Sequence, residues 1–345
     1  MDINLLVATA NALVAPGKGI LAADESGGTI KRRFDSINVE STEENRRDYR
    51  ELLFRTEDAS RYISGVILFD ETIRQIGADG TPLVKLLQEQ SIIPGIKVDK
   101  GTQPLPEAPG EKITEGLDGL RDRLSEYFEL GARFTKWRGV IGIGNGMPSI
   151  NCIATNAHAL ARFAALSQEA GLVPIVEPEV LMDGDHTIER CFDVNEVTLR
   201  EVFHQMSQQD VSLEGCLLKP SMVLSGSLAS NRAGSQEVAE KTLICLKRVV
   251  PASIPGIVFL SGGQSDAEAT ANLNAINQRA ASVGAPWQLS FSYGRGLQQA
   301  PLKAWVGKPE NVKRAKQAFY HRAKVTSAAR QGCYALAMED ALFTD

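Results

Sequence analysis

The most constraining feature of this 345-residue sequence is a series of eight short apolar runs separated by longer amphipathic segments. Each run is too short for a typical globular helix and contains or adjoins β-branched or aromatic residues, which favours a buried strand. The segments 43–56, 156–171 and 237–250 repeat apolar residues at three- and four-residue spacing, which is typical of helices. The eight runs are GILAAD (19–24), ISGVILFD (63–70), IIPGIKVD (92–99), ARFTKWRGVI (132–141), LVPIVEPE (172–179), GCLLKP (215–220), GIVFLSGG (256–263) and WQLSFSYGR (287–295).

Nearly all-apolar strands that alternate with helices predict a parallel sheet covered by helices. Eight such units, with no hydrophilic linker between halves, fit a closed (β/α)8 (TIM) barrel better than an open doubly wound sheet. We therefore predict an α/β fold in which residues 1–345 form a single barrel domain. The N-terminal segment is predicted to be an amphipathic helix, and the residues from about 331 to 345 a C-terminal tail.

The composition excludes several classes of protein. A net charge of −5 argues against a general nucleic-acid binder but is compatible with a small anionic substrate. The five cysteines include no Cys-x-x-Cys pair, and the four histidines are widely separated, so we expect reduced thiols, a cytoplasmic location and no metal site. No apolar stretch reaches 18 residues, so we expect no membrane span.

Ionisable or phosphate-binding residues stand at the end of nearly every predicted strand. In a (β/α)8 barrel these positions face the active site. A single residue of this kind is most simply a solvated charge at the rim, but a repetition over successive strands predicts a shared site. The residues are Asp24, Asp70, Lys97, Lys136 with Arg138, Glu177 with Glu179, Lys219, Ser261 and Arg295.

Lys219 ends the apolar run 216–218, which is an unusual place for a surface lysine. Lys136 and Arg138 are two residues apart, so on a strand both side chains leave the same face. They could pair with carboxylates in a buried ion network. Alternatively, desolvation and a neighbouring cation keep the Lys219 amine neutral, and therefore nucleophilic toward ketones. Glu177 could act as the acid/base of that chemistry or as a salt-bridge partner.

Phosphate sites are predicted at two places. Ser261-Gly262-Gly263 and Gly294-Arg295 follow the last two predicted strands, where such barrels commonly bind phosphate. The Ser/Gly/Thr turn at 25–29, together with Lys97, is the second candidate. Two anion sites on opposite sides of a central amine suggest a substrate that is phosphorylated at both ends.

Nine motifs follow one another in an order that resembles a known family. They are GILAADESGGTIKRR, GIKVDKG, FTKWR, IVEPE, DGDH, LLKP, FLSGGQS, NLNAIN and SYGR. Together they resemble the class I fructose-bisphosphate aldolases over residues 14–335, nearly the whole chain. The resemblance implies a homotetramer that acts on small sugar phosphates and uses no metal or other cofactor.

The resemblance also implies roles for individual residues. Lys219 would be the Schiff-base lysine and Glu177 its acid/base partner, and the reacting centre would be completed by Asp24, Lys136 and Glu179. The 1-phosphate would be held by Ser261, Gly262, Gly294 and Arg295. The 6-phosphate would be held by Ser26, Thr29 and Lys97, with Arg33 and Arg138 nearby.

The sequence departs from the family pattern at two places. A Ser-Thr-Gly-Ser turn of the family reads Ser26-Gly27-Gly28-Thr29 here, and because the last position keeps a hydroxyl, we expect phosphate binding to be retained. Many members end in a tyrosine that assists proton exchange on the enamine, whereas this sequence ends Phe343-Thr344-Asp345. The bound substrate phosphate or a water is an alternative donor of that proton.

We therefore predict the reversible cleavage of fructose 1,6-bisphosphate to dihydroxyacetone phosphate and glyceraldehyde 3-phosphate. Two alternatives remain open at this point. Another Schiff-base barrel, such as a transaldolase or a sugar-acid aldolase, would need only one phosphate site. A catalytically silent sugar-phosphate binder or scaffold would bind phosphate without turnover.

Overall fold

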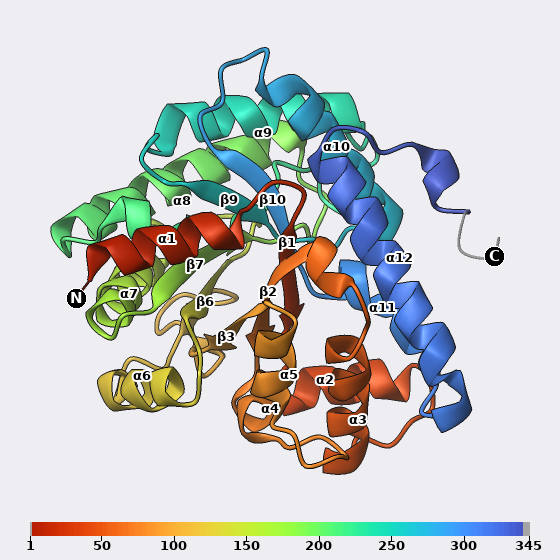
Figure 1. The fold of residues 1–345 in the computed structure, drawn as a ribbon. Coiled ribbons are helices and arrows are strands. Elements are labelled where there is room, and N and C mark those ends of the chain that lie inside the picture. The colour runs from red at the N-terminus through yellow and green to blue at the C-terminus, as the bar shows by residue number, and fades with distance from the viewer. Residues whose placement is uncertain (1, 341–345) are drawn as a thin grey trace.

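The computed structural model describes residues 2–340, which form a closed barrel of eight parallel strands surrounded by helices (Figure 1). The strands pair in the order β1-β2-β3-β6-β7-β8-β9-β10, and β10 pairs with β1 to close the barrel. Each strand begins within one of the eight apolar runs, so the predicted (β/α)8 fold is confirmed. The strands are β1 (Gly19–Ala23), β2 (Ile63–Leu68), β3 (Ile93–Lys97), β6 (Phe134–Ile141), β7 (Val173–Val180), β8 (Leu217–Leu218), β9 (Gly256–Phe259) and β10 (Gln288–Tyr293).

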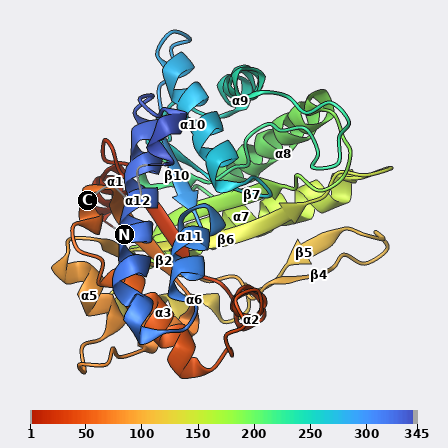
Figure 2. The same cartoon turned by 90° about the vertical axis from the view of Figure 1, so that its right-hand side faces the viewer.

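The helices cover the outside of the barrel, and the three segments with helical spacing in the sequence fall within or largely coincide with α3, α7 and α9. The helices are α1 (Ile3–Leu13), α2 (Gly27–Asp35), α3 (Glu43–Phe54), α4 (Asp70–Arg74), α5 (Leu83–Glu89), α6 (Leu120–Glu129), α7 (Ile150–Glu169), α8 (Ile188–Gln208), α9 (Ser235–Val249), α10 (Asp266–Ala280), α11 (Arg295–Trp305) and α12 (Val312–Arg330). A two-stranded hairpin of β4 (Thr102–Pro104) and β5 (Lys112–Thr114) follows β3 and projects beside the carboxyl ends of β6 and β7 (Figure 2).

Local sequence signals explain where the long helices begin and end. The hydroxyls of Ser149 and Thr187 accept hydrogen bonds from the backbone N–H groups of Cys152 and Arg190, which caps the first turns of α7 and α8. Gly171 follows α7 with a φ of +77°, a conformation that glycine adopts without steric cost. Apolar residues on one side of these helices are buried against the strands, as the helical spacing predicts.

The N-terminal helix α1 closes the end of the barrel from which the strands start (Figures 1 and 2). Leu6, Ala10 and Leu13 of α1 are buried in a cluster with inward-facing residues of six strands, here called the lower half of the barrel interior. Glycines make room for this helix, because a Cβ at Gly65 would lie 2.7 Å from Leu13 Cδ2, and one at Gly256 would lie 2.5 Å from Val14 Cγ1. The strand members of this cluster are Ile20, Ala22, Ile67, Phe134, Val173, Ile175, Leu217 and Val258, with Ile93 partly buried against them.

The C-terminal end of α12 is hydrogen-bonded to the residues that follow α1. The buried guanidinium of Arg330, the last residue of α12, donates hydrogen bonds to the carbonyl oxygens of Val14, Ala15 and Lys18. These carbonyls include groups that the end of α1 leaves without helical partners, so the contact satisfies them. None of the helices described between residues 2 and 340 is long and apolar enough to cross a membrane.

Candidate active site

A cavity of about 850 Å³ opens at the carboxyl ends of the strands, opposite α1. Every residue to which the family resemblance gave a role lines this cavity, although these residues come from seven different strand ends and loops and from helix α2. They are Asp24, Ser26, Thr29, Arg33, Lys97, Lys136, Arg138, Glu177, Glu179, Lys219, Ser261, Gly262, Gly294 and Arg295. The convergence of ionisable residues at strand ends is therefore a property of the folded chain.

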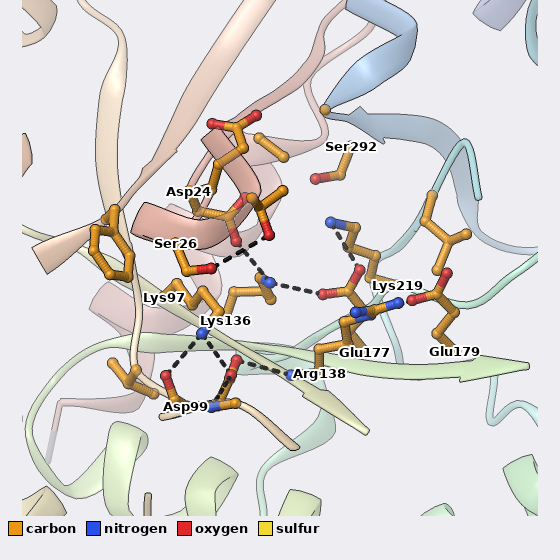
Figure 3. Close-up of a pocket in the computed structure, with 18 of the residues that line it drawn as sticks. Asp24, Ser26, Lys97, Asp99, Lys136, Arg138, Glu177, Glu179, Lys219 and Ser292 are labelled. Atoms are coloured by element: carbon orange, nitrogen blue, oxygen red, sulfur yellow. Dashed lines mark hydrogen bonds and ion pairs between the residues drawn. The ribbon is translucent and has the colours of Figure 1, made fainter. Parts of the chain in front are cut away.

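Strand alternation brings the side chains of β6 and β7 into the same space. Lys136 and Arg138 leave the inner face of β6, and Glu177 and Glu179 leave the inner face of the neighbouring β7 (Figure 3). In the parallel register of the two strands, Arg138 is paired with Glu177. Lys219 follows β8 at once, and its N–H still donates to the Val176 carbonyl of β7 at 2.8 Å, so its position is set by the sheet.

Four buried side chains form a continuous ion-paired network at the centre of the cavity (Figure 3). The Lys219 Nζ lies 3.0 Å from Glu177 Oε1, and the Lys136 Nζ lies 3.0 Å from Glu177 Oε2. The Lys136 Nζ also lies 2.7 Å from Asp24 Oδ2. Glu177 therefore bridges two lysines, and Lys136 bridges two carboxylates. The ion network that the sequence left as one alternative is present and contains the proposed reactive lysine.

The network determines the protonation of three of its members. Burial alone would raise the pKa of Asp24, but the charges of Lys136 and Lys219 outweigh burial and hold that pKa well below its usual range. Burial would also raise the pKa of Glu177, and the same two lysines lower it. For Lys136, burial would lower the pKa, but Asp24 and Glu177 raise it. Asp24 and Glu177 are thus carboxylates and Lys136 is a cation near pH 7.

A second layer of ion pairs lies around this centre. Arg138 is paired with Glu179, and the Lys97 Nζ lies 2.5 Å from Asp99 Oδ1 and donates to the Asp99 carbonyl at 2.8 Å. Asp99 also accepts hydrogen bonds from the N–H groups of Gly101 and Arg138, so it connects the end of β3 to β6. Sequence reasoning missed Asp99 as a site residue, although its place two residues after Lys97 at the end of a predicted strand was a usable signal.

The loops after β9 and β10 form a concave backbone surface. Gly262 adopts a φ of +54°, and Ser261 beside it is buried. Arg295 begins α11 and donates from its Nη2 to the carbonyls of Gly262 at 3.1 Å and Gln264 at 2.8 Å, so it braces one loop against the other. A helix N-terminus, a glycine turn and a guanidinium together suit a phosphate group.

The turn that begins α2 supplies a second polar surface. The hydroxyls of Ser26 and Thr29 lie 3.3 Å apart, and Ser26 makes no side-chain hydrogen bond to cap the helix. A Cβ at Gly27 would meet nothing within 4 Å, so the turn is open at this position. Lys97 lines the same cavity. The two hydroxyls and the N-terminus of α2 can therefore receive an anion.

Arg33 lines the same cavity as Ser26 and Thr29, and its guanidinium has contacts on the side of the loop after β10. Its guanidinium is paired with Glu25, and its Nη2 would lie 3.6 Å from a Cβ at Gly294, in the loop after β10. Sequence reasoning did not select Glu25 or Ser292, which also line the cavity. Ser292 is 1% exposed and its hydroxyl has no hydrogen-bond partner among the described residues.

Comparison with known proteins identifies the family to which this geometry belongs. Residues 5–344 match the glycolytic family described as fructose-bisphosphate aldolase class-I. The chain belongs to the class I fructose-bisphosphate aldolases. A probable fructose-bisphosphate aldolase class 1 from Xanthomonas campestris pv. campestris is 59% identical, over 96% of this chain and 99% of the relative. A cytosolic fructose-bisphosphate aldolase from Arabidopsis thaliana is 55% identical, over 95% of this chain and 83% of the relative.

A solved structure of a class member has the same fold. Fructose-bisphosphate aldolase from Plasmodium falciparum, in a ternary complex with TRAP and a small-molecule inhibitor, superposes with a TM-score of 0.94 and 50% sequence identity. The likeness covers 96% of this chain and 95% of that one. These findings confirm the predicted family, its fold and its enzyme class, an aldehyde-lyase, over the other Schiff-base barrels that the sequence left open.

Proposed function

We propose that Lys219 carries the aldolase reaction of this protein, the reversible cleavage of fructose 1,6-bisphosphate, through a Schiff base. The observation that supports this assignment most directly is the buried contact of the Lys219 amine with Glu177, at 3.0 Å, inside a cavity that also has two polar surfaces suited to phosphate. Among residues 2–340, Lys136 and Lys219 are the two lysines of this cavity with nearly fully buried side chains, and Lys136 is held between two carboxylates. Lys219 is therefore the better nucleophile.

The first half of the reaction forms an electron sink. Glu177 takes the proton that it shares with Lys219 in their ion pair, the free amine attacks the C2 ketone of the substrate, and a proton passes from the nitrogen to the C2 oxygen to give a carbinolamine. The same carboxyl then returns a proton to the departing C2 hydroxyl, which leaves as water, and the nitrogen becomes an iminium. Because Glu177 contacts both Lys219 and Lys136, it can exchange protons without leaving the network.

The second half breaks the carbon–carbon bond. One of the carboxylates around the network takes the proton of the C4 hydroxyl, the C3–C4 bond breaks, and its electron pair moves into the iminium to give an enamine. Glyceraldehyde 3-phosphate leaves as the aldehyde. Protonation of the enamine at C3 and hydrolysis of the iminium release dihydroxyacetone phosphate and restore the Lys219 amine. The C-terminal residues Phe343, Thr344 and Asp345, which the sequence has where many family members have the tyrosine that assists this proton transfer, lie outside the described residues.

The two polar surfaces orient the substrate across this centre. We propose that Ser261, Gly262, Gly294 and Arg295 hold the 1-phosphate, and that Ser26, Thr29 and Lys97 hold the 6-phosphate. Lys136 and Asp24 then lie between the two phosphates, next to the bond that breaks. Arg138 and Glu179, paired at the side of the network, would align Glu177 and the sugar chain.

Reductive trapping tests the nucleophile. Borohydride added with dihydroxyacetone phosphate should reduce the iminium and fix the substrate on Lys219, as peptide mass mapping would show. Lys219→Met should abolish the label, whereas Lys247→Met, a change far from the cavity, should leave it intact. A label on any other lysine would overturn the assignment. Turnover should also persist in EDTA, and its loss on chelation would point to metal-dependent chemistry.

Three further properties are proposed from family membership. We expect a homotetramer, which light scattering can test, and a cytoplasmic location, since relatives in Arabidopsis thaliana are named cytosolic. We also propose that residues 1–345 form one barrel domain with a tail from about residue 331. In the described part of that tail, the Tyr334 N–H donates to Asn274 and Glu339 pairs with Arg322. If the rest of the chain is one domain, limited proteolysis should release tail peptides and no larger fragment.

A further inference from the structure

A buried carboxylate that the proposed mechanism does not use lies beside the reacting centre. Glu25 follows Asp24 just after β1 ends, and it lines the cavity while its carboxylate contacts side chains of α3 and α11. Glu25 is 7% exposed, yet it contacts two arginines and one amide. A buried carboxylate with this many partners is a costly feature that a structural role in one ion pair does not require.

Two of its partners hold Glu25 in one orientation. Arg50 of α3 is 1% exposed and lies 3.1 Å from Glu25 Oε2, and it also donates to the Ala23 carbonyl at 3.1 Å. Gln298 of α11 donates from its Nε2 to Glu25 Oε1 at 2.6 Å and to the Ala22 carbonyl at 2.7 Å. The same two side chains therefore fix the end of β1 and the direction of the Glu25 carboxylate.

The third partner, Arg33, is the one that reaches the cavity. Its Nη1 contacts Glu25 Oε1, while its Nη2 faces the loop at Gly294. Arg33 comes from α2, and its side chain is 24% exposed, so without Glu25 it would have many other rotamers. A planar guanidinium that is held at one nitrogen presents its remaining donors in a fixed direction.

The charges of this cluster leave a positive excess at one place. Two guanidiniums share one carboxylate, and Arg50 is buried away from the cavity. The uncompensated charge is thus presented by Arg33 beside Gly294 and Arg295, which is the surface proposed to hold the 1-phosphate. A doubly charged phosphate at that surface would meet Arg33 and Arg295 together.

We propose that Glu25 is a positioning residue, which aims Arg33 at the phosphate bound between the loops after β9 and β10. This inference rests on the proposed function and deepens it: Glu25 controls the affinity for the phosphate that fructose 1,6-bisphosphate, fructose 1-phosphate and dihydroxyacetone phosphate have in common. It does not act on the phosphate of glyceraldehyde 3-phosphate, which binds at Ser26 and Thr29.

The test measures the concentration of dihydroxyacetone phosphate that gives half-maximal borohydride trapping, in wild-type protein and in Glu25→Gln. We expect this concentration to rise about tenfold in the variant, the size of one lost charge-assisted contact. Trapping at saturation should stay near that of the wild type, and the KM for glyceraldehyde 3-phosphate in the condensation direction should not change. Glu111→Gln is the matched control, because Glu111 is also 7% exposed and hydrogen-bonded but lies outside the cavity.

A double-mutant cycle separates positioning from a general loss of structure. If Glu25 acts through Arg33, Glu25→Gln should have no further effect on half-maximal trapping in an Arg33→Met background. Additive effects, or a Glu25→Gln variant with lowered Tm and unchanged half-maximal trapping, would overturn the proposal. Failure to trap the wild-type protein would instead overturn the proposed function.

A second variant keeps the test available if Glu25→Gln does not fold. Glu25→Met with Arg50→Met removes both buried charges together, which is usually better tolerated than the removal of one. It leaves Arg33 without its anchor. We expect the same increase in half-maximal trapping concentration, and an unchanged value would contradict the proposal.

Discussion

The two halves of the barrel interior are built by the same strands and yet have opposite chemistry. On β6, Phe134 lies in the lower half and Lys136 in the upper half, two residues further along the same face. On β7, Ile175 lies below and Glu177 above. The lower half is apolar and filled by α1, whereas the upper half is charged and holds a cavity of about 850 Å³.

The apolar residues of the lower half stabilise the fold, whereas the charged residues of the upper half form the candidate active site. The lower half removes apolar surface from water, at about 25 cal/mol per Å². The upper half buries charges, and a buried ion pair is often no more stable than apolar residues of the same size. Burying four charges therefore lowers the stability of the folded protein, and the apolar contacts of the lower half must offset that loss. The four residues are Asp24, Lys136, Glu177 and Lys219. Substitutions in the upper half should change kcat or KM, whereas substitutions in the lower half should change stability alone.

The largest effect is expected from Lys136→Met in the upper half. The change leaves Asp24 and Glu177 buried without their shared cation, which should cost about 3–5 kcal/mol of stability. We expect kcat to fall about a thousandfold, the size found when a preorganised electrostatic group is removed. Steady-state kinetics and urea unfolding would measure both. Lys241→Met, which removes one partner of a surface pair at 3.6 Å, should change neither, and an active Lys136→Met enzyme would contradict the comparison.

The same variant has an expected signature in acid. Lys136 is the largest of the charges that lower the pKa values of Asp24 and Glu177 below their usual 3.8 and 4.5. Because those pKa values are lower in the folded protein, their stabilisation is complete above the usual values and is lost as the pH falls through the folded ones. Without Lys136 both folded pKa values rise. Acid unfolding of Lys136→Met, followed by circular dichroism, should therefore begin at a higher pH than that of the wild type.

The next effect in size is expected from Leu13→Ala in the lower half. Leu13 is fully buried where α1 meets the barrel, so the cavity left behind should cost about 2–5 kcal/mol of stability. Since the side chain lies at the opposite end of the strands from the network, kcat and KM should stay within about twofold in protein that remains folded. Leu5→Ala, on the exposed side of the same helix, is the control. Loss of kcat in folded Leu13→Ala protein would show that the two halves are coupled.

The smallest effect is expected from Lys97→Met, at the edge of the upper half. Lys97 already shares its charge with Asp99, so its removal should leave the central network in place. We expect the KM for fructose 1,6-bisphosphate to rise about tenfold, as for one charge-assisted contact, and that for fructose 1-phosphate to stay constant. Lys31→Met removes an exposed lysine outside the cavity and should change neither KM. An equal rise for both substrates would place Lys97 outside the 6-phosphate site.

Much of the fold and the site followed from sequence pattern because both depend on position along a strand. Eight apolar runs predicted eight strands, and the residues at their ends predicted the site, since parallel strands in a barrel end on one side. Residues that act by holding other side chains were not predicted from the sequence. Glu25 acts through contacts with Arg33 of α2 and Arg50 of α3, and no local pattern predicts such pairs across elements.

The contacts of Arg33 could not be predicted from the sequence. The family resemblance placed it near Ser26 and Thr29, and it lies four residues after Thr29. On a helix, four residues amount to about one turn, and a long side chain can reach a different part of a cavity from the one its backbone faces. The contact with Glu25 decides its direction, and Glu25 is itself held by helices α3 and α11.

By itself, the sequence determined the alternation of strands and helices, the change from apolar to ionisable residues along each strand, and the family. Only the tertiary structure decided how the charges are shared. Glu177 bridges Lys136 and Lys219, and Lys136 bridges Glu177 and Asp24. These side chains meet because closure of the barrel brings together the ends of β1, β6, β7 and β8. Coulomb energies and proton positions depend on the distances between these charges, and those distances are properties of the closed barrel and of no single segment.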